Sequence, residues 1–319
     1  MLLNILFLIV GFVILIYGAN MLVDGGSALA HQLKISNMVI GLTVVAFGTS
    51  TPELVVNVVS SIDGSSGLAL GNILGSNIFN IMAILGITAL IVPLKVKRTT
   101  TWIEVPIAVF AAVLVLLMAD ESPQGYISRL EGISLLCFFA VFLLYTFALA
   151  RYGEAGEGEE VQIKPYSVSK SVFFILLGLI GLIAGGRLLV SGAVSIAQTI
   201  GISERIIGLT IVSIGTSLPE LATSLIAARK GNADIAIGNV VGSNIFNTFL
   251  ILGVSATIRP LEAPAGSIND LIVNIIAAGL LFLFIFTGKG RGISRWEGVL
   301  LTICYIAYLT MLICGKSFF

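Results

Sequence analysis

Two glutamates lie inside long apolar stretches of the sequence, where charged side chains are rare. Glu53 and Glu220 each lie about two-thirds of the way along such a stretch, whereas most of the 17 acidic residues lie in polar connections or at the ends of apolar runs. A carboxylate at membrane depth is costly and indicates function by default. A structural ion pair is the alternative, but the one base inside a span, Arg187, could serve at most one of the two.

Each glutamate follows a proline in a repeated motif, GTSTPE at 48–53 and GTSLPE at 215–220. Proline lacks an amide donor and clashes with the preceding helical turn. Carbonyl groups of that turn, among them those of Ala46 and Ser213, are therefore predicted to line a cavity or bind an ion. The same broken turns carry five hydroxyl groups, on Thr49, Ser50, Thr51, Thr216 and Ser217.

A second repeated motif, GNxxGSNIFN, adds amides and hydroxyls: Asn72, Ser76, Asn77 and Asn80, then Asn239, Ser243, Asn244 and Asn247. Ser76 and Asn80 are four residues apart and so share one side of a helix, and we interpret these Ser/Asn pairs as ion ligands. Asn77 and Asn244 are predicted to form hydrogen bonds between helices. Gly71 and Gly75 are predicted to allow close helix packing.

All of these candidate ligands are hard oxygen donors. Ca²⁺ takes about six to eight such oxygens at about 2.3–2.6 Å. Neither motif contains the Cys or His that would favour Zn²⁺ or Cu⁺. The chain has one histidine, and its three cysteines, Cys137, Cys304 and Cys314, are predicted to be small core residues in apolar runs.

The composition predicts that membrane-spanning helices position these residues. Of 319 residues, 57% are hydrophobic and 11% charged, and the mean hydropathy is +1.08, which excludes a soluble enzyme, a secreted disulfide scaffold and a disordered chain. A net charge of zero gives no basic surface for nucleic acid. Ten apolar runs are long enough to span a bilayer, at 2–23, 36–62, 67–92, 102–119, 130–150, 170–196, 205–228, 234–258, 268–287 and 297–315.

The chain also contains an internal duplication. Residues 40–94, shifted by 167, align without a gap on 207–261, with 28 identities in 55 positions. The first copy follows one span and the second follows six, so the odd offset inverts the second copy in the membrane. Inverted repeats are typical of secondary transporters. We therefore predict an all-α integral membrane protein of ten transmembrane helices in two inverted five-helix repeats, 1–150 and 170–319, joined by a linker at 151–169.

The distribution of Lys and Arg predicts the orientation. With the N-terminus outside, twelve of the 17 basic residues fall in inner loops and four in outer segments, and basic residues favour cytoplasmic loops. We predict a multi-pass plasma-membrane protein with both termini outside and 151–169 in the cytoplasm. The expected partners are the lipid bilayer and the transported ions, with no obligatory protein partner.

The pairing of GTSTPE with GSNIFN, and of GTSLPE with GSNIFN, resembles the two α-repeats of the cation/calcium exchanger superfamily, in particular the prokaryotic sodium/calcium exchangers. The resemblance covers nearly the whole chain. It implies an antiporter without a cofactor, not an enzyme, in which the first and sixth helices slide over a rigid core of eight. It also implies 3 Na⁺ per Ca²⁺ and alternating access. That ratio is electrogenic, so an inside-negative potential would favour Ca²⁺ extrusion.

The resemblance further implies four ion sites in a diamond between the second, third, seventh and eighth helices. Carried over by position, Glu53 and Glu220 bridge a central Ca²⁺ site, with Thr49 and Thr216 as further ligands. The flanking Na⁺ sites combine Ser76 with Ser217, Thr216 and the Ser213 carbonyl, and Ser243 with Ser50, Thr49 and the Ala46 carbonyl. Asn80 and Asn247 flank the middle.

Two departures bear on the coupling ion. Potassium-dependent exchangers, and some prokaryotic members, carry Asp at the position of Asn247, and proton/calcium exchangers typically carry Glu at the position of Gly75 or Gly242. A proton- or potassium-coupled cation exchanger remains the alternative. An intramembrane enzyme would need a Ser/His pair, a catalytic Asp pair or HExxH, and none is present. A passive channel is disfavoured by the inverted repeats with broken helices.

Overall fold

The computed structural model describes residues 2–120, 126–152, 164–199, 213–262, 267–287 and 291–314. These ranges are almost entirely helical, with four two-residue strands. The α-helices are α1 (Leu2–Leu33), α2 (Asn37–Ile40), α3 (Ala46–Thr49), α4 (Thr51–Ile62), α5 (Ser66–Ile78), α6 (Gly86–Ile91), α7 (Val105–Asp120), α8 (Arg129–Tyr152), α9 (Val168–Thr199), α11 (Ser213–Thr216), α12 (Leu218–Arg229), α13 (Ala233–Ile245), α14 (Gly253–Ile258), α15 (Ser267–Thr287) and α16 (Arg295–Cys314). The strands are β1 (Leu94–Lys95), β2 (Tyr126–Ile127), β3 (Leu261–Glu262) and β4 (Gly292–Ile293).

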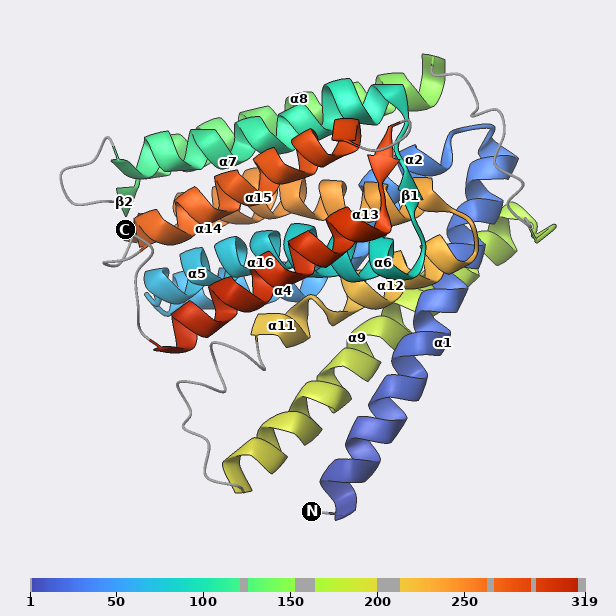
Figure 1. Cartoon of the computed structure of the whole chain (residues 1–319), viewed down its shortest axis with the longest axis horizontal. Coiled ribbons are helices and arrows are strands. Elements are labelled where there is room, and N and C mark those ends of the chain that lie inside the picture. The colour runs from blue at the N-terminus through green and yellow to red at the C-terminus, as the bar shows by residue number, and fades with distance from the viewer. Residues whose placement is uncertain are drawn as a thin grey trace.

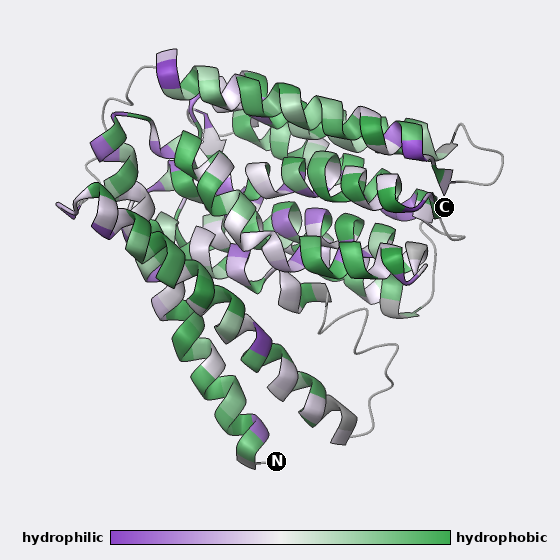
Figure 2. Ribbon diagram, turned by 180° about the vertical axis from the view of Figure 1, so that it is seen from behind, coloured by the Kyte–Doolittle hydropathy of each residue, from purple (hydrophilic) through white to green (hydrophobic). Residues whose placement is uncertain are grey.

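The helices separate into a long pair and a layered core. α1 and α9 lie side by side and project obliquely from the stacked helices that make up the rest of the protein (Figure 1). Seven described helices are long and apolar enough to cross a membrane, and a helix broken within 37–62 adds an eighth. The outer helices are hydrophobic over most of their length (Figure 2), as lipid contact requires.

α1 and α9 approach each other closely because glycines line their contact. Gly11, Gly18 and Gly25 recur every seven residues on α1, and they face a matching series on α9 at Gly178, Gly185 and Gly192. A Cβ on Gly18 would lie 2.7 Å from the Leu182 amide nitrogen, and one on Gly185 would lie 2.6 Å from that of Leu15. Small residues at this spacing let membrane helices pack backbone to backbone, so α1 and α9 form one unit.

We expect Gly185→Val to force α1 and α9 apart, because the atoms in its way belong to the backbone and cannot rotate aside. Overpacking costs about 1–3 kcal/mol, so the melting temperature in detergent should fall by several degrees. Gly279→Val is the matched control, because a Cβ on Gly279 meets nothing within 4 Å. Equal melting temperatures for the two variants would contradict the close packing.

Two helices break at the predicted prolines. Asn37–Thr49 and Thr51–Ile62 are bent by 47° at Ser50, and Pro52 falls in the first turn of α4, where its missing amide costs no hydrogen bond. In the second repeat, α12 likewise begins with Pro219 in its first turn, after Ser217. Each break places the N-terminal turn of a helix, with Glu53 or Glu220 in it, inside the protein.

The helices that follow each break contain π-helical segments. Phe79–Leu85 and Phe246–Leu252 are related by the 167-residue shift and lie directly after α5 and α13. π-helical turns occur frequently at functional sites. Asn80 and Asn247 are the second residues of these segments.

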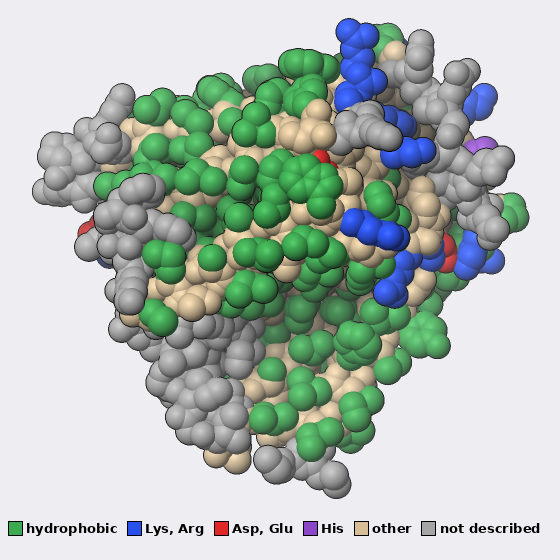
Figure 3. All heavy atoms as spheres, viewed as in Figure 1, with side chains coloured by type: hydrophobic (Ala, Val, Ile, Leu, Met, Phe, Trp, Pro, Cys, Tyr) green, Lys and Arg blue, Asp and Glu red, His purple; other side chains and the backbone are tan. Residues whose placement is uncertain are grey.

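Two small antiparallel sheets mark opposite ends of the bundle. β1 pairs with β4, and β2 pairs with β3. α13, which follows the turn at Lys230, contacts β1. The end of the bundle that contains β1, β4 and this turn is called the Lys230 end. α5, which follows the turn at Asp63, contacts β3. The opposite end, which contains β2, β3 and this turn, is called the Asp63 end. Lys and Arg side chains gather at the Lys230 end on the face shown in Figure 3.

The prediction that the cysteines are core residues is wrong. Cys137 and Cys314 are exposed and Cys304 is half-buried. In a chain whose outer surface is itself apolar, an apolar run does not distinguish the core from the lipid-facing side. The predicted linker 151–169 and the span 205–228 lie partly outside the described residues.

Candidate functional site

The two motif glutamates lie in one buried site and are linked through each other's serine. The Ser217 hydroxyl donates a hydrogen bond to Glu53 Oε1 (2.9 Å), and the Ser50 hydroxyl donates one to Glu220 Oε1 (3.0 Å). Each serine stands three residues before its own glutamate but bonds to the other one. Because α4 and α12 begin directly after these serines, the two broken helices present their first turns to the same space.

The neighbouring threonines follow the same crossed pattern. Thr216 lies beside the Glu53 carboxylate, and Thr49 lies beside that of Glu220. Thr49 also donates to Asn239 Oδ1 (3.0 Å). From the second motif, the Ser243 hydroxyl approaches Glu220 Oε1 at 3.4 Å. The structure therefore places hydroxyls of the second repeat around Glu53 and hydroxyls of both repeats around Glu220.

The site contains buried oxygens that no described residue satisfies. Glu53 and Glu220 are 1% and 0% exposed, yet the second carboxylate oxygen of each has no hydrogen-bond partner among the described residues. The same holds for Ser76 Oγ and for the side-chain oxygens of Asn80 and Asn247. Unsatisfied buried polar atoms are rare in native proteins. Five acceptor atoms of this kind on residues of the two repeated motifs, two of them carboxylate oxygens, fit a site for hard cations.

The asparagines of the second motif join the two repeats. Asn80 Nδ2 donates to Asn244 Oδ1 (3.1 Å), and Asn247 Nδ2 donates to Asn77 Oδ1 (3.1 Å). Because the amide nitrogens of Asn80 and Asn247 are held in this way, their oxygens are the atoms left unpaired. Asn77 also donates to Thr248 Oγ1 (3.0 Å). The predicted interhelical role of Asn77 and Asn244 is confirmed.

Two other predicted features differ from expectation. The Ala46 carbonyl accepts the Ser50 amide (3.0 Å), so the proline break does not free it, although a carbonyl keeps a second lone pair. Thr51 donates to the Phe47 carbonyl (3.0 Å) and takes no part in the site. In the second repeat, the Ser217 amide donates to the Ile214 carbonyl and not to that of Ser213, the residue equivalent to Ala46. The side chain of Ser213, in α11, is not described.

The packing role predicted for Gly71 is also wrong. A Cβ on Gly71 would meet nothing within 4 Å, whereas one on its repeat mate Gly238 would lie 3.1 Å from the Leu42 amide nitrogen. The outward position of Gly71 needs no small residue for packing. The first glycine of the GNxxGSN motif is therefore closely packed in the second repeat but not in the first.

Sequence reasoning missed the polar residues one turn beyond each glutamate. Asn57 Nδ2 donates to the Glu53 carbonyl (2.9 Å). Its repeat mate Ser224 accepts from Asn239 Nδ2 (2.9 Å), which also donates to the Glu220 carbonyl (3.2 Å). These contacts fix the first turns of α4 and α12. A polar residue four positions after each glutamate was the signal available.

A cavity of about 270 Å³ reaches the site from one side. Thr216, Pro52 and Pro219 form its inner wall, and Arg187 and Val190 on α9 form its outer wall. Arg187 is exposed, and its side chain makes no ion pair with a described residue, Glu53 and Glu220 included. The structural ion-pair alternative for the glutamates therefore finds no support in the described part of the chain.

Comparison with known proteins gives a consistent result. The family model described as sodium/calcium exchanger protein matches residues 3–148 and 170–314. The putative antiporter CaxA of Alkalimonas amylolytica is 39% identical over 98% of this chain and 99% of its own, and the sodium/calcium exchanger MaX1 of Methanosarcina acetivorans is 34% identical over 97% and 98%. The solved structure of the sodium-calcium exchanger NCX_Mj soaked with Na⁺ and Ca²⁺ superposes with a TM-score of 0.85 at 32% identity, covering 98% of this chain and 99% of NCX_Mj.

Proposed function

This chain belongs to the sodium/calcium exchanger protein family, and from that premise we propose that it exchanges Na⁺ for Ca²⁺ by alternating access at the site of Glu53 and Glu220. One observation carries the proposal: in the part of the chain that the structure describes, both buried carboxylates keep an unpaired oxygen, as do Ser76, Asn80 and Asn247. Two negative charges and neutral oxygens suit one divalent ion or several Na⁺ ions in the same space.

We assign the ligand roles by position in the two repeats. Glu53 and Glu220, with Thr49 and Thr216, would hold Ca²⁺ at the centre. Ser76 and Ser217, with the Ser213 carbonyl, would form one flanking Na⁺ site, and Ser243 and Ser50, with the Ala46 carbonyl, the other. Asn80 and Asn247 would flank the centre through their unpaired oxygens. The crossed Ser–Glu bonds support this arrangement, because they place ligands from opposite repeats on each carboxylate.

The sheet pairing supports ten crossings in two inverted repeats, 1–150 and 170–319. In a ten-span chain, β1 and β4 fall in the third and ninth connections, and β2 and β3 fall in the fourth and eighth. Each pair then shares one side of the membrane, as direct pairing demands. Any count that changed the parity between β1 and β4 would place paired strands on opposite sides.

We propose that the Lys230 end is cytoplasmic, because the basic residues of the described inner connections, such as Lys34, Lys95 and Arg98, lie there. Lys95→Cys and Glu262→Cys compare exposed positions in opposite sheets, in a background with Cys137, Cys304 and Cys314 replaced by Ala. In intact cells, an impermeant maleimide should label Glu262→Cys and spare Lys95→Cys until the cells are lysed. The reverse pattern would refute the orientation.

Transport itself is tested in proteoliposomes that contain the purified chain. We expect Ca²⁺ uptake when Na⁺ is loaded inside and absent outside, and no uptake when the Na⁺ gradient is replaced by a H⁺ or a K⁺ gradient. Uptake driven by H⁺ or K⁺ alone would favour the alternative coupling ion. Equal Ca²⁺ flux without any counter-ion would refute exchange.

A further inference from the structure

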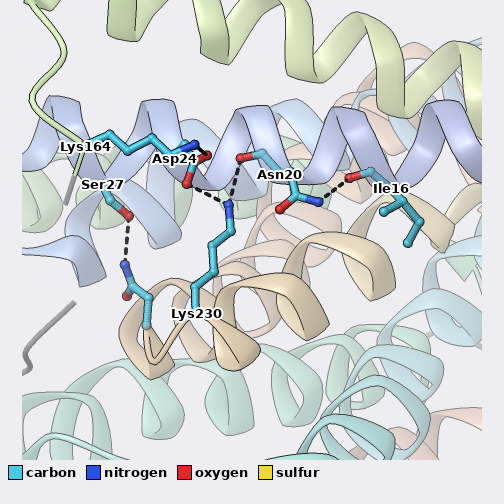
Figure 4. Close-up of polar contacts among 7 residues, drawn as sticks. Ile16, Asn20, Asp24, Ser27, Lys164 and Lys230 are labelled. Carbon is cyan, nitrogen blue, oxygen red and sulfur yellow. Dashed lines mark hydrogen bonds and ion pairs between the residues drawn. The ribbon is translucent and has the colours of Figure 1, made fainter. Parts of the chain in front are cut away.

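A cluster of ion pairs ties α1 to the core at the Lys230 end. Asp24 on α1 contacts Lys230 at 2.6 Å and Lys164 at 2.8 Å (Figure 4). Lys230 also donates to the Asn20 carbonyl (3.3 Å), and Asn232 donates to Ser27 (2.9 Å). The Asp24 side chain is only 13% exposed, and its hydrogen bond raises the pKa of Lys164. Successive turns of α1 are thus fastened to the turn between α12 and α13.

The internal repeat places a counterpart of this cluster at the Asp63 end, with the charges exchanged. The 167-residue shift relates Lys230 to Asp63, and it relates Asn20 and Asp24 on α1 to Arg187 and Ser191 on α9. At the Lys230 end, the long helix carries the acid and the core turn carries the base. At the Asp63 end, the long helix carries the base and the core turn carries the acid.

The two charged residues of this counterpart, Arg187 and Asp63, are not paired with each other in this structure. Arg187 and Asp63 are both exposed, and neither forms an ion pair with a described residue. The Arg259 guanidinium lies beside Gly64 but does not pair with Asp63. Between α9 and α4 lies the 270 Å³ cavity that reaches Thr216. At the Lys230 end, by contrast, α1 packs along α12, and the cavity of about 940 Å³ beside Asp24 is lined by none of the proposed ion ligands.

We propose that Asp24 with Lys230 and Arg187 with Asp63 are alternating gate pairs, each closing one end of the ion pathway while the other end is open. The first pair is formed here and the second is apart. When α1 and α9 move to the opposite position, repeat symmetry brings Asp63 beside the backbone of Arg187, as Lys230 now lies beside that of Asn20. The Arg187 guanidinium then reaches the Asp63 carboxylate. This inference rests on the alternating access proposed above.

The exchanged charges have a further consequence. Asp24 and Arg187 lie on the two helices that the glycine contact makes one unit. A negative and a positive charge that move together carry no net charge through the membrane field. The gate pairs can therefore alternate without adding voltage dependence to the transport step.

Cysteine cross-linking tests the two closed states. In the background without Cys137, Cys304 and Cys314, we compare Asp24→Cys/Lys230→Cys with Arg187→Cys/Asp63→Cys, using a short bifunctional methanethiosulfonate. We expect both variants to cross-link, and each cross-link to stop Ca²⁺ flux until it is reduced. No cross-link in the Arg187/Asp63 variant, under ion conditions in which the uncross-linked protein exchanges, would overturn the proposal. Cross-linking is measured independently of Ca²⁺ flux. If both pairs cross-link but the protein does not exchange Na⁺ for Ca²⁺, the proposed function is refuted and the gate pairs are not.

Charge variants test the energetic role of each pair. The reporter is alkylation of Val56→Cys, which lines the 270 Å³ cavity. Losing a charged hydrogen bond shifts an equilibrium by about tenfold, so Asp24→Asn should lower the population open at the Asp63 end by about that factor, and Arg187→Gln should raise it. Arg229→Gln, on the same cavity as Asp24 but outside its ion pairs, should change nothing. The charge-swapped variant Arg187→Asp with Asp63→Arg should restore the wild-type alkylation of Val56→Cys. If Asp24→Asn and Arg187→Gln change this alkylation in the same direction, gating by these pairs is refuted.

Discussion

Replacing Glu53 or Glu220 with glutamine is expected to abolish Ca²⁺ exchange in a protein that remains folded. Glutamine keeps the shape of the side chain and can still accept the hydrogen bond from Ser217 or Ser50. It removes one of the two charges facing the ion. At about 4 Å and an effective dielectric constant of 20, a pair of unit charges interacts by about 4 kcal/mol. Against a divalent ion the loss is about twice that, so affinity should fall by more than roughly a thousandfold.

The measurement is Na⁺-driven Ca²⁺ uptake into proteoliposomes, with Ca²⁺-dependent thermal stabilisation in detergent as a second readout. Binding to the native state raises the melting temperature, so the wild type should be stabilised by Ca²⁺ and both variants should not. Glu262→Gln is the control, because Glu262 is an exposed acid in β3 far from the site. Near-normal uptake by both Glu53→Gln and Glu220→Gln would refute the site.

The sequence predicted the centre of the site because its chemistry is unusual for its surroundings. A carboxylate after a proline inside an apolar stretch has few structural explanations, and the duplication doubled the signal at Glu53 and Glu220. The sequence did not predict the crossed serine–glutamate contacts, because the resemblance grouped Ser50 with Ser243 and Ser217 with Ser76 in flanking ion sites. In the structure each of these serines, Ser50 and Ser217, donates a hydrogen bond to the glutamate of the opposite repeat, a contact that depends on how the two repeats pack.

The geometry around the asparagines could not be read from helical periodicity. The spacing of Ser76 and Asn80 was interpreted with 3.6 residues per turn, but Phe79–Leu85 is π-helical. The wider turn rotates the residues that follow relative to those before. Neither the π-helical segment nor the bond from Asn80 to Asn244 has a local sequence signal, because both depend on packing between repeats.

Charged residues on the long helices were the least predictable. Asp24 stood at an expected span end, and its partners lie 140 and 206 residues further along the chain. Arg187 has a polar but uncharged repeat mate in Asn20, so the duplication gave no hint of its role. Only the arrangement of α1 against the core shows that Asp24 pairs with Lys164 and Lys230.

Exchange is expected to depend on membrane voltage, and the charge of the site explains why. With Glu53 and Glu220 ionised and Asn247 neutral, the site without ions carries about −2. One Ca²⁺ brings it to zero, whereas three Na⁺ leave +1. In the proposed movement of α1 with α9, Asp24 and Arg187 add no net charge, because their opposite charges cancel. The Na⁺-loaded step then carries one charge, worth about 2.3 kcal/mol per 100 mV, which shifts the equilibrium Ca²⁺ ratio roughly fortyfold and favours Ca²⁺ exit from an inside-negative cell.

The test is Na⁺-driven Ca²⁺ flux in vesicles clamped with K⁺ and valinomycin, repeated with a protonophore and a pH gradient to separate voltage from any direct effect of K⁺. Wild-type Ca²⁺–Ca²⁺ self-exchange should ignore voltage, because the Ca²⁺-loaded site is neutral. Asn247→Asp is the matched variant: an ionised third carboxylate makes the Ca²⁺-loaded site −1 and the site with three Na⁺ neutral. Its Ca²⁺–Ca²⁺ self-exchange should therefore become voltage-dependent. The Ca²⁺ concentration ratio across the membrane at equilibrium should keep its wild-type response to voltage, because the number of Na⁺ exchanged per Ca²⁺ is unchanged. If wild-type Na⁺-driven flux and its equilibrium both ignore the clamped voltage, exchange is electroneutral and two Na⁺, not three, balance each Ca²⁺.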